Sequence, residues 1–377
     1  MPSPRRLTFA GAIALLLVTT VMTVPPPARA ADVPGWTQET ITFSGFKPAF
    51  LAGPELRIAR DGRLVGVGSR ASADLSSAGL SIFERAPGAS STWRIVANTN
   101  NFDVEPSLAI ARGGTINVAW RREGAGLRFT SNRTGRWVVE AIPSSTTAAA
   151  PSLALTSGGS PSIAWASALT RTTNAIRIAS KTVTGWHVRT IASGAVESPA
   201  LAVDAWSKRY VAFVRTGGSA AGLYVATDRS GTWTTTRISS QTGLGSVRIA
   251  LDLARHVHVA YTREAGATSI VRHATNASGR WVISTVSGPG GGWSPELALD
   301  SAGRPRVAYA AAPLYDSSTA MLARWTRIGW TREPISADLV SGRPGLAIDA
   351  HGADHALLFR ITDGFMGGEF SHATTAP

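Results

Sequence analysis

The 377-residue sequence contains no cysteine, and lysine occurs only at Lys47, Lys181 and Lys208. The lack of cysteine excludes disulfide bonds and a lipid-modified cysteine, so the packed core alone must stabilise the fold. The basic residues are almost all arginine, the formal net charge is +13, and no Lys/Arg run exceeds two residues. A basic surface suits acidic glycans or anionic polymers, but GC-rich codons would equally explain the many arginines. Because no basic run is present, we expect no sequence-specific nucleic-acid binding.

The first thirty residues have the pattern of an export signal. Two arginines precede the apolar run Leu7–Val24, and the small residues Ala28 and Ala30 follow it. This order is typical of a cleaved signal peptide, although the run is also long enough for a retained transmembrane anchor. We expect residues 1–30 to be removed after Ala30. Residues 31–377 would then be a secreted, monomeric protein with no membrane attachment.

The rest of the chain lacks any helix-period stretch of useful length and instead repeats itself. The segment "PSLAIARGGTINVAW" from Pro106 recurs as "PSLALTSGGSPSIAW" from Pro151 and "PELALDSAGRPRVAY" from Pro295. Seven copies start at Pro54, Pro106, Pro151, Pro199, Val247, Pro295 and Pro344. Apolar residues alternate within each copy, and Gly- and Asp-rich turns separate the alternating runs, which indicates four short strands per copy.

Four strands in a unit of roughly 40–50 residues are typical of a β-propeller blade. The last copy ends without the "GxW" segment that begins the fourth strand of the other copies, whereas the N-terminal segment "GWTQETITF" (35–43) supplies one. We therefore predict an all-β fold: a seven-bladed propeller of four-stranded antiparallel blades, closed by the N-terminal strand completing the last blade. Closure removes the open sheet edges that invite aggregation.

The segment "TDRSGTW" (227–233) lies between the predicted third and fourth strands, and "SNRTGRW" (131–137) and "TNASGRW" (275–281) lie at the same place. An Asp or Asn can cap such a turn through its side-chain oxygen. The tryptophan recurs in every blade, where a large ring would pack between neighbouring sheets. Its positions are Trp36, Trp93, Trp137, Trp186, Trp233, Trp281 and Trp330.

These repeats resemble those of secreted bacterial propellers with degenerate Asp-box (BNR-like) repeats, in the broad sialidase-like superfamily. The resemblance covers the chain from Gly35 to Thr374 and implies the propeller fold. It leaves the activity open, because propellers host hydrolases, lyases, lectins and scaffolds.

One position suggests an anion site on the loop face around the central channel. Sixteen residues after the repeat start, five of the seven copies carry an arginine: Arg70, Arg122, Arg215, Arg263 and Arg360. A partial ring of guanidinium groups would bind carboxylate, phosphate or sulfate through paired hydrogen bonds. The alternative is that each arginine pairs within its own blade or extends into solvent. Two loop aromatics, Trp293 and Tyr315, are candidates for contacting a sugar, and Trp293 could equally pack as a plug over the channel.

The resemblance also implies what a sialidase would need: three arginines on the substrate carboxylate, a Tyr nucleophile assisted by Glu, and an Asp acid/base. Arg122, Arg215 and Arg263 could supply the arginines, and Tyr315 lies beside Asp316 in a suitable loop. Candidate loop acids are Glu105, Glu123, Glu197, Glu264 and Asp363. The family's Arg-Ile-Pro motif has no match here and the family usually has six blades, so we assign no catalytic residue.

We predict no metal site and no cofactor. His256 and His258 share one face of a strand, but no third ligand lies nearby in sequence, and no nucleotide-binding fingerprint is present. The sequence favours a secreted binding module for an extracellular glycan or another anionic polymer. A sialidase-like glycoside hydrolase or lyase and a protein-interaction scaffold are the alternatives.

Overall fold

The computed structural model of the chain describes residues 33–41, 47–48, 53–71, 77–88, 92–266, 268–311, 318–363 and 367–375. The predicted export signal, its cleavage site and Tyr315 lie outside the described residues. The described part is all-β: strands make up its regular structure, apart from one 3₁₀ turn at Gly218–Ala220. No helix within it has the length and apolarity needed to cross a bilayer.

The strands form seven consecutive blades, the first three of which are built as follows. Blade 1 contains β3 (Glu55–Ile58), β4 (Leu64–Ala71), β5 (Ala78–Arg85) and β6 (Arg94–Asn98), with the short β2 (Lys47–Pro48) also paired to β4. Blade 2 contains β7 (Asp103–Ile110), β8 (Ile116–Arg122), β9 (Gly126–Ser131) and β10 (Val138–Ala141). Blade 3 contains β11 (Ala148–Leu155), β12 (Pro161–Ala168), β13 (Asn174–Thr182) and β14 (Gly185–Gly194).

The remaining blades follow the same order around the ring. Blade 4 contains β15 (Val196–Val203), β16 (Arg209–Arg215), β17 (Gly222–Thr227) and β18 (Thr234–Ser239). Blade 5 contains β19 (Leu244–Leu251), β20 (Val257–Ala265), β21 (Thr268–Thr275) and β22 (Val282–Thr285). Blade 6 contains β23 (Trp293–Leu299), β24 (Pro305–Ala311), β25 (Ser318–Thr326) and β26 (Gly329–Val340). Blade 7 contains β27 (Gly345–Ile348), β28 (Asp354–Asp363), β29 (Gly367–Thr375) and β1 (Trp36–Ile41).

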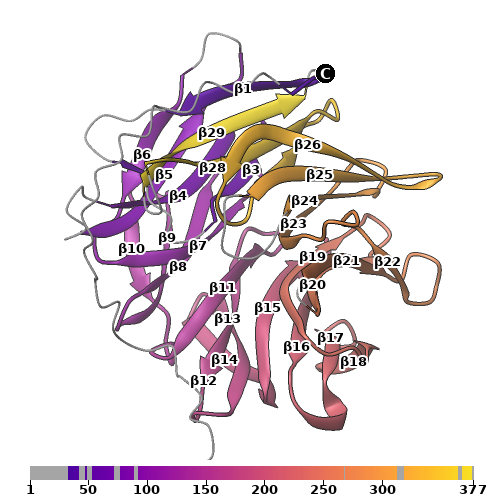
Figure 1. Ribbon diagram of the computed structural model, residues 1–377. Coiled ribbons are helices and arrows are strands. Elements are labelled where there is room, and N and C mark those ends of the chain that lie inside the picture. Colours follow the sequence, from indigo (N-terminus) through magenta and orange to yellow (C-terminus); the bar gives the residue numbers. More distant parts are fainter. Residues whose placement is uncertain are drawn as a thin grey trace, which may run out of the picture.

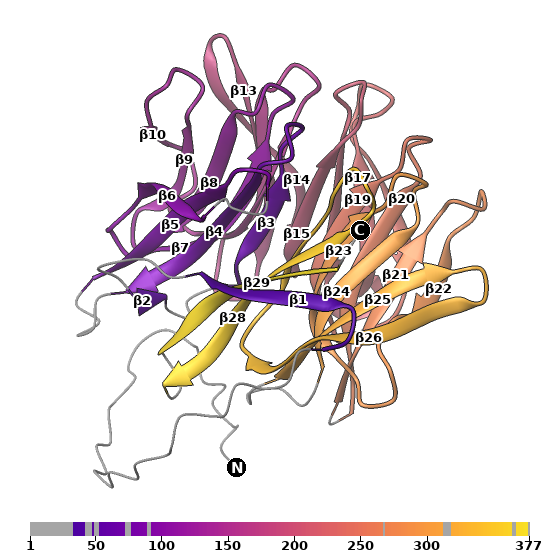
Figure 2. The same cartoon turned by 90° about the horizontal axis from the view of Figure 1, so that it is seen from above.

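The N-terminal strand closes the ring as predicted. β1 pairs antiparallel with β29 from Trp36↔Thr375 to Ile41↔Phe370, so the two ends of the described chain share the last blade (Figures 1 and 2). Blades 6 and 7 belong to one eight-stranded sheet because Val340, at the end of β26, pairs with Arg360 of β28. The seven blades therefore form six hydrogen-bonded sheets. Every described strand pairing is antiparallel, which matches the predicted fold.

The core lies between adjacent blades, because the alternating strands bury apolar side chains on both of their faces. One cluster, for example, joins Leu223 of blade 4 to Val259 of blade 5. Five blades carry a large ring, at most 1% exposed, at the same position of the second strand: Trp120, Trp165, Phe213, Tyr261 and Tyr309. In blade 1 this position is Gly68, and the ring of Phe370 fills the space that a side chain would take there.

The repeated outer tryptophan joins neighbouring blades by a hydrogen bond as well as by packing. In four blades its indole Nε1 donates a hydrogen bond to a side chain of the preceding blade. The acceptor lies three residues after the outer tryptophan of that preceding blade. The pairs are Trp36–Glu333, Trp93–Glu39, Trp186–Glu140 and Trp330–Ser284, at 2.9–3.0 Å. The prediction that this ring packs between sheets is confirmed.

Replacing Trp186 with phenylalanine should lower the free energy of unfolding by about 1–2 kcal/mol, because an aromatic ring remains while the bond to the Glu140 carboxylate is lost. Urea denaturation would measure the difference. Trp233→Phe is the matched control: the residue at the acceptor position of the preceding blade is Arg189, which cannot accept a hydrogen bond. Equal losses in the two variants would show that the hydrogen bond contributes nothing.

The "TDRSGTW"-type turn has a structural role. Asp228 Oδ1 accepts the backbone N–H of Arg209, the first residue of β16, at 2.7 Å. The asparagines at the same place do the same: Asn132 Oδ1 accepts from Ile116 N, and Asn276 Oδ1 from Val257 N. The side chain thus ties the turn between the third and fourth strands to the start of the second strand.

Candidate functional site

A β-bulge interrupts the first strand of five consecutive blades, from blade 2 to blade 6, in the same register. In blade 4, Glu197 pairs with Val214 and Ala200 with Ala212, so the pairing skips Ser198 and Pro199. The first skipped residue of each blade has a φ between 47° and 54°; these residues are Glu105, Ala150, Ser198, Ser246 and Ser294. Proline follows in four of the blades, and proline in a sheet is confined to edges and bulges. The same bulge, with one residue in the left-handed backbone conformation, therefore recurs in five neighbouring blades around the channel axis.

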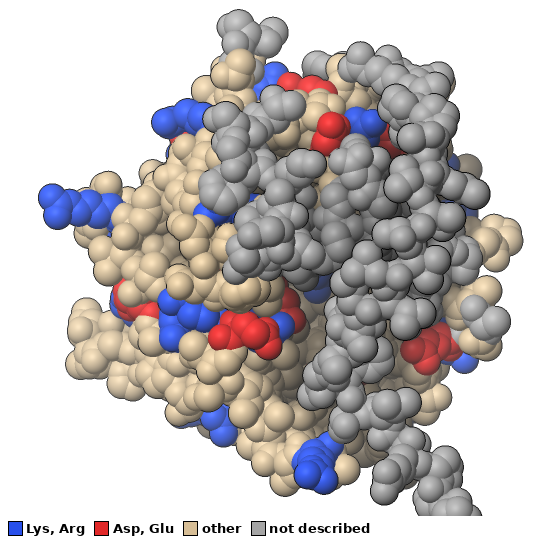
Figure 3. Space-filling model, turned by 60° about the vertical axis from the view of Figure 1, so that its left-hand side comes forward, with Lys and Arg blue, Asp and Glu red and all other residues tan. Residues whose placement is uncertain are grey.

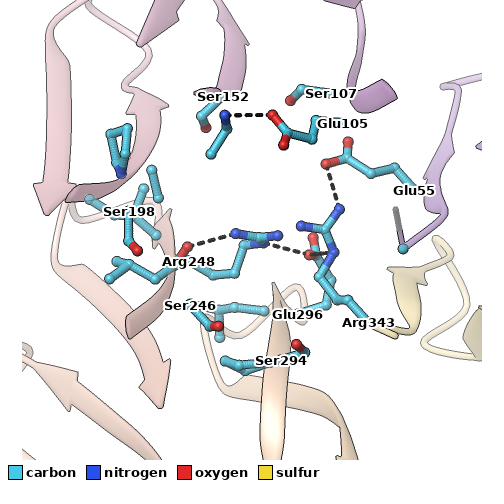
Figure 4. Close-up of a pocket in the computed structure, with 18 of the residues that line it drawn as sticks. Glu55, Glu105, Ser107, Ser152, Ser198, Ser246, Arg248, Ser294, Glu296 and Arg343 are labelled. Atoms are coloured by element: carbon cyan, nitrogen blue, oxygen red, sulfur yellow. Dashed lines mark hydrogen bonds and ion pairs between the residues drawn. The ribbon is translucent and has the colours of Figure 1, made fainter. Parts of the chain in front are cut away.

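The bulges border a cavity of about 520 Å³ in the central channel, and residues from blades 1 to 6 and from the segment that leads into blade 7 line it. Figure 4 shows its polar side chains converging from different blades. A concave site with a few convergent polar groups is the usual form of a small-ligand pocket. We take this channel cavity as the candidate functional site.

Blades 5, 6 and 1, together with the segment between blades 6 and 7, place a cluster of charges on one wall of the channel cavity. Arg343 bridges two carboxylates: its Nη2 lies 3.1 Å from Glu55 Oε1 and its Nε lies 3.3 Å from Glu296 Oε2. Arg248 Nε donates to Glu296 Oε2 at 2.9 Å, and Arg57 Nη1 lies 3.5 Å from Glu296 Oε1. Both glutamates are buried, at 5% and 3% exposed. The cluster holds three guanidinium groups and two carboxylates, so it has a formal excess of one positive charge.

Burial and pairing oppose each other in this cluster. Burial raises the pKa of Glu296, and the charges of Arg248 and Arg57 act against that rise. Burial alone would lower the pKa of Arg57, but the charges of Glu55 and Glu296 outweigh it, and the pKa is raised. The guanidinium group of Arg57 therefore stays charged over the whole physiological pH range.

Blades 2, 3 and 4 give the opposite wall of the cavity small side chains. One residue after the repeat start, blades 1, 5 and 6 carry Glu55, Arg248 and Glu296. At the same position, blades 2, 3 and 4 carry Ser107, Ser152 and Ala200. Ser107 Oγ accepts the N–H of Leu153 at 3.0 Å, and Ser152 Oγ accepts the N–H of Leu201 at 2.9 Å. Both bonds run to the following blade, so these serines hold neighbouring blades together while leaving room in the cavity.

Glu105 stands at the cavity on the first bulge and is held by two groups. Arg121 contacts its carboxylate through Nε at 3.1 Å and Nη2 at 3.2 Å. The backbone N–H of Ala150, on the bulge of the next blade, donates to Glu105 Oε2 at 2.8 Å. Of the other loop acids, Glu197 has a pKa raised by burial and by the charge of Glu264.

The five arginines of the predicted ring lie at equivalent places near the end of the second strand, and the structure gives four of them local contacts. Arg122 pairs with the fully buried Asp103 at 2.8 Å, and Arg360 pairs with Asp338 at 2.9 Å. The guanidinium of Arg215 lies over the rings of Phe213 and Tyr224. Arg70, which is 3% exposed, donates to the carbonyl of Thr99. Arg263, half-buried, lies opposite Leu244.

The described residues that line the channel cavity include none of these five arginines. Anion binding by that set stays a prediction, while Arg57, Arg248 and Arg343 supply the guanidinium groups of the cavity itself. Trp293 does line the cavity, and its buried Nε1 has no hydrogen-bond partner among the described residues. Its role toward a sugar stays a prediction, as does that of Tyr315.

The repeat itself carried a signal for the arginines that sequence reasoning missed. Three residues after the repeat start, six copies have alanine and one has Arg57. One residue after the start, four copies have Ser, Ala or Gly, and the others have Glu55, Arg248 and Glu296. Because alternate residues of the innermost strand face the channel, charged departures from a small consensus residue mark its lining.

The histidines singled out in the sequence take part in side-chain pairs. His256 Nδ1 lies 2.7 Å from Asp252 Oδ2, and the buried His258 contacts His273. Within the described part of the chain, no group of three or more His, Asp or Glu side chains is arranged to hold a metal ion.

Charge on the surface is mixed rather than segregated. On the face in Figure 3, acidic and basic side chains stand next to each other over the described surface. Partly exposed basic side chains also pair with acidic ones, as Lys181 does with Glu140. The net positive charge therefore does not by itself define a binding face.

Comparisons with known proteins establish the fold. No protein-family model matches the chain, and no curated protein sequence matches it. Among solved structures, the chain is similar to a protein of unknown function from Dyadobacter fermentans, with a TM-score of 0.55, 13% identity and coverage of 91% of this chain and 99% of that chain. It is also similar to the polysaccharide lyase Uly1, with a TM-score of 0.52, 12% identity and coverage of 86% and 90%. The endosialidase of phage phi92 is similar as well, with a TM-score of 0.53, 8% identity and coverage of 90% of this chain and 69% of that chain. The chain thus shares its propeller fold with glycan-active enzymes.

Proposed function

We propose that this protein is a secreted binding module of the sialidase-like propeller group that takes an acidic glycan at the channel cavity. The observation that carries the proposal is the cluster in which Arg57, Arg248 and Arg343 face only two carboxylates. Guanidinium groups recognise carboxylate and sulfate through paired, charge-assisted hydrogen bonds. A cavity of about 520 Å³ has room for a sugar unit, and Trp293 offers it an aromatic wall.

Binding of purified residues 31–377 to neutral, sialylated, sulfated and uronic-acid glycans at low and high salt tests the proposal. We expect selective binding of carboxylated glycans that persists at high salt, because contacts in a cavity are screened less than surface charge. If every acidic glycan binds at low salt and none binds at high salt, the binding is nonspecific charge attraction. No binding of any glycan would leave the interaction scaffold as the better function.

Arg248→Gln should weaken binding of an acidic glycan about tenfold or more, since it removes a charge-assisted contact. Calorimetric titration would measure the change, and Arg248→Lys, which keeps a cation beside Glu296, should recover part of it. The control is Arg304→Gln, whose side chain is 62% exposed outside the cavity. An equal loss in Arg304→Gln would place the binding outside the channel.

A glycoside hydrolase or lyase is the second candidate, because Glu55 and Glu296 lie in the same cavity and Arg343 joins them. Two of the structural neighbours are named as a polysaccharide lyase and an endosialidase. The glycans that bind would be incubated with the protein and examined for new reducing ends or unsaturated sugars. Turnover that Glu296→Gln abolishes would favour the enzyme, and intact ligand after prolonged incubation would favour the binding module.

A further inference from the structure

We infer that the bulges of blades 4, 5 and 6 form an arc of backbone N–H donors that binds a carboxylate of the ligand. This N–H arc consists of Ser198, Ser246 and Ser294, which all line the channel cavity. The inference rests on the proposed function, because it names the chemical group of an acidic glycan that is held there and the atoms that hold it.

Blade 3 shows what the N–H of a bulge residue does. Ala150 is skipped by the strand pairing, which passes from Ala149↔Ala166 to Ser152↔Ala164. Its N–H donates at 2.8 Å to a carboxylate oxygen of Glu105, which extends from the equivalent bulge of blade 2. The geometry of this bulge thus presents a backbone donor to a carboxylate that comes from the side of the preceding blade.

The same geometry recurs in the next three blades without the internal carboxylate. Ser198, Ser246 and Ser294 have φ values of 52°, 47° and 49°, against 50° for Ala150, and the pairing skips them in the same way. The residues that stand where Glu105 stands, one blade earlier in each case, are Ala150, Ser198 and Ser246. None of these has a carboxylate, so a ligand carboxylate can take the place that Glu105 takes in blade 3.

The surroundings of the N–H arc favour an anion. Arg248 lies two residues after Ser246 on β19, and its guanidinium is part of the positive cluster. Figure 4 shows Ser198, Ser246 and Ser294 along one side of the cavity, with Arg248 beside them. Backbone N–H groups at a concave site are a general means of binding anions. Neutral backbone donors and the guanidinium of Arg248 together favour a carboxylate over a neutral group.

The test introduces the internal carboxylate that blade 4 lacks. Ser198→Glu places it where Glu105 stands in blade 2, and Glu105 shows that glutamate is tolerated at a φ of 54°. The introduced side chain should occupy the N–H of Ser246 and weaken binding of sodium glucuronate at least tenfold. Ser198→Gln is the matched control of the same size without the charge, and we expect a smaller loss from it, because its neutral amide oxygen accepts the N–H of Ser246 more weakly than a carboxylate and does not repel glucuronate.

The second readout is the amide NMR signals of Ser198, Ser246 and Ser294 in the mature chain labelled with ¹⁵N-serine. Glucuronate should move these amides while glucose leaves them unchanged. In Ser198→Glu the Ser246 amide should already be shifted and should no longer respond. The inference is overturned if glucuronate moves none of the three amides, or if Ser198→Glu binds glucuronate as tightly as the unchanged protein.

These outcomes separate the inference from the proposed function. If acidic glycans bind and depend on Arg248 while the serine amides stay unmoved, the N–H arc is wrong and the binding module stands. If glucuronate moves the amides but no glycan on the array binds, the carboxylate site stands and the glycan function is wrong.

Discussion

Replacing Arg343 with methionine should lower the free energy of unfolding by roughly 3–5 kcal/mol, the range found when one partner of a buried ion pair is removed. Arg343 contacts Glu55 and Glu296 at once, and both carboxylates are at most 5% exposed. Methionine keeps most of the volume but leaves the two buried negative charges with fewer counter-charges. Urea denaturation at neutral pH would measure the loss.

Two further variants distinguish the charge effect from a simple loss of packing. Adding Glu55→Gln to Arg343→Met should recover part of the stability, because the amide oxygen can still accept the N–H of Leu108, which donates to Glu55 Oε2 at 2.7 Å. Arg304→Met removes an ion pair whose arginine is 62% exposed, while the Asp300 carboxylate keeps the backbone N–H groups of Ala302 and Arg304, so the loss should be less than about 1 kcal/mol. If Arg343→Met costs no more than Arg304→Met, the cavity cluster contributes little to stability.

The fold could be predicted because the seven copies of the repeat all form the same four-stranded blade, so each copy gives independent evidence for it. Strand alternation, the Asp or Asn turn and the outer tryptophan recur, so an error in one copy is corrected by the others. The missing fourth strand of the last copy indicated closure by Gly35–Phe43, and β1 pairs with β29 as expected. The eight-stranded sheet was not predictable, because it depends on the single pair Val340↔Arg360.

The site was harder to predict because it consists of departures from the repeat. Arg57 replaces an alanine that the other six copies keep, and Arg343 precedes a repeat start. A search for what recurs selects the second-strand arginines, such as Arg122, which the structure pairs with the buried Asp103. The bulges had a visible sign in the proline at the start of the repeat, since proline has no N–H to donate within a sheet. The left-handed φ of the bulge residues could not be predicted, because the periodicity of the sequence indicates strands but not the backbone conformation of single residues within them.

The second large effect concerns acid, because two blades bury a stacked pair of histidines. His258 Nδ1 lies 3.1 Å from His273 Nε2 in blade 5, and His355 Nδ1 lies 3.1 Å from His372 Nε2 in blade 7. The ring centroids are 5.3 Å apart in both pairs. Burial, together with the charge of His258, lowers the pKa of His273 to about 3. Burial also lowers the pKa values of His258 and His355.

The direction of the effect follows from these lowered pKa values. In the unfolded chain each histidine takes up a proton near pH 6.5, whereas in the folded chain His273 stays neutral until about pH 3. The unfolded state therefore binds more protons between these values, and stability falls as the pH falls through this window. His273 alone contributes a slope approaching about 1.4 kcal/mol per pH unit, or roughly 2–3 kcal/mol between pH 6.5 and 4.5. His258 and His355 change stability in the same direction.

Urea denaturation at several pH values should show this loss, and His273→Gln should reduce it. The amide of glutamine can still bond to His258 but takes up no proton in this range, so the slope between pH 6.5 and 4.5 should fall by about 1 kcal/mol per pH unit. His187→Gln, at an exposed position, is the control for the substitution itself. Equal slopes in all three proteins would mean that His273 takes up its proton in the folded protein at about the same pH as in the unfolded chain. That outcome would require water to reach the contact between His273 and Trp330, whose rings lie 5.5 Å apart between blades 5 and 6.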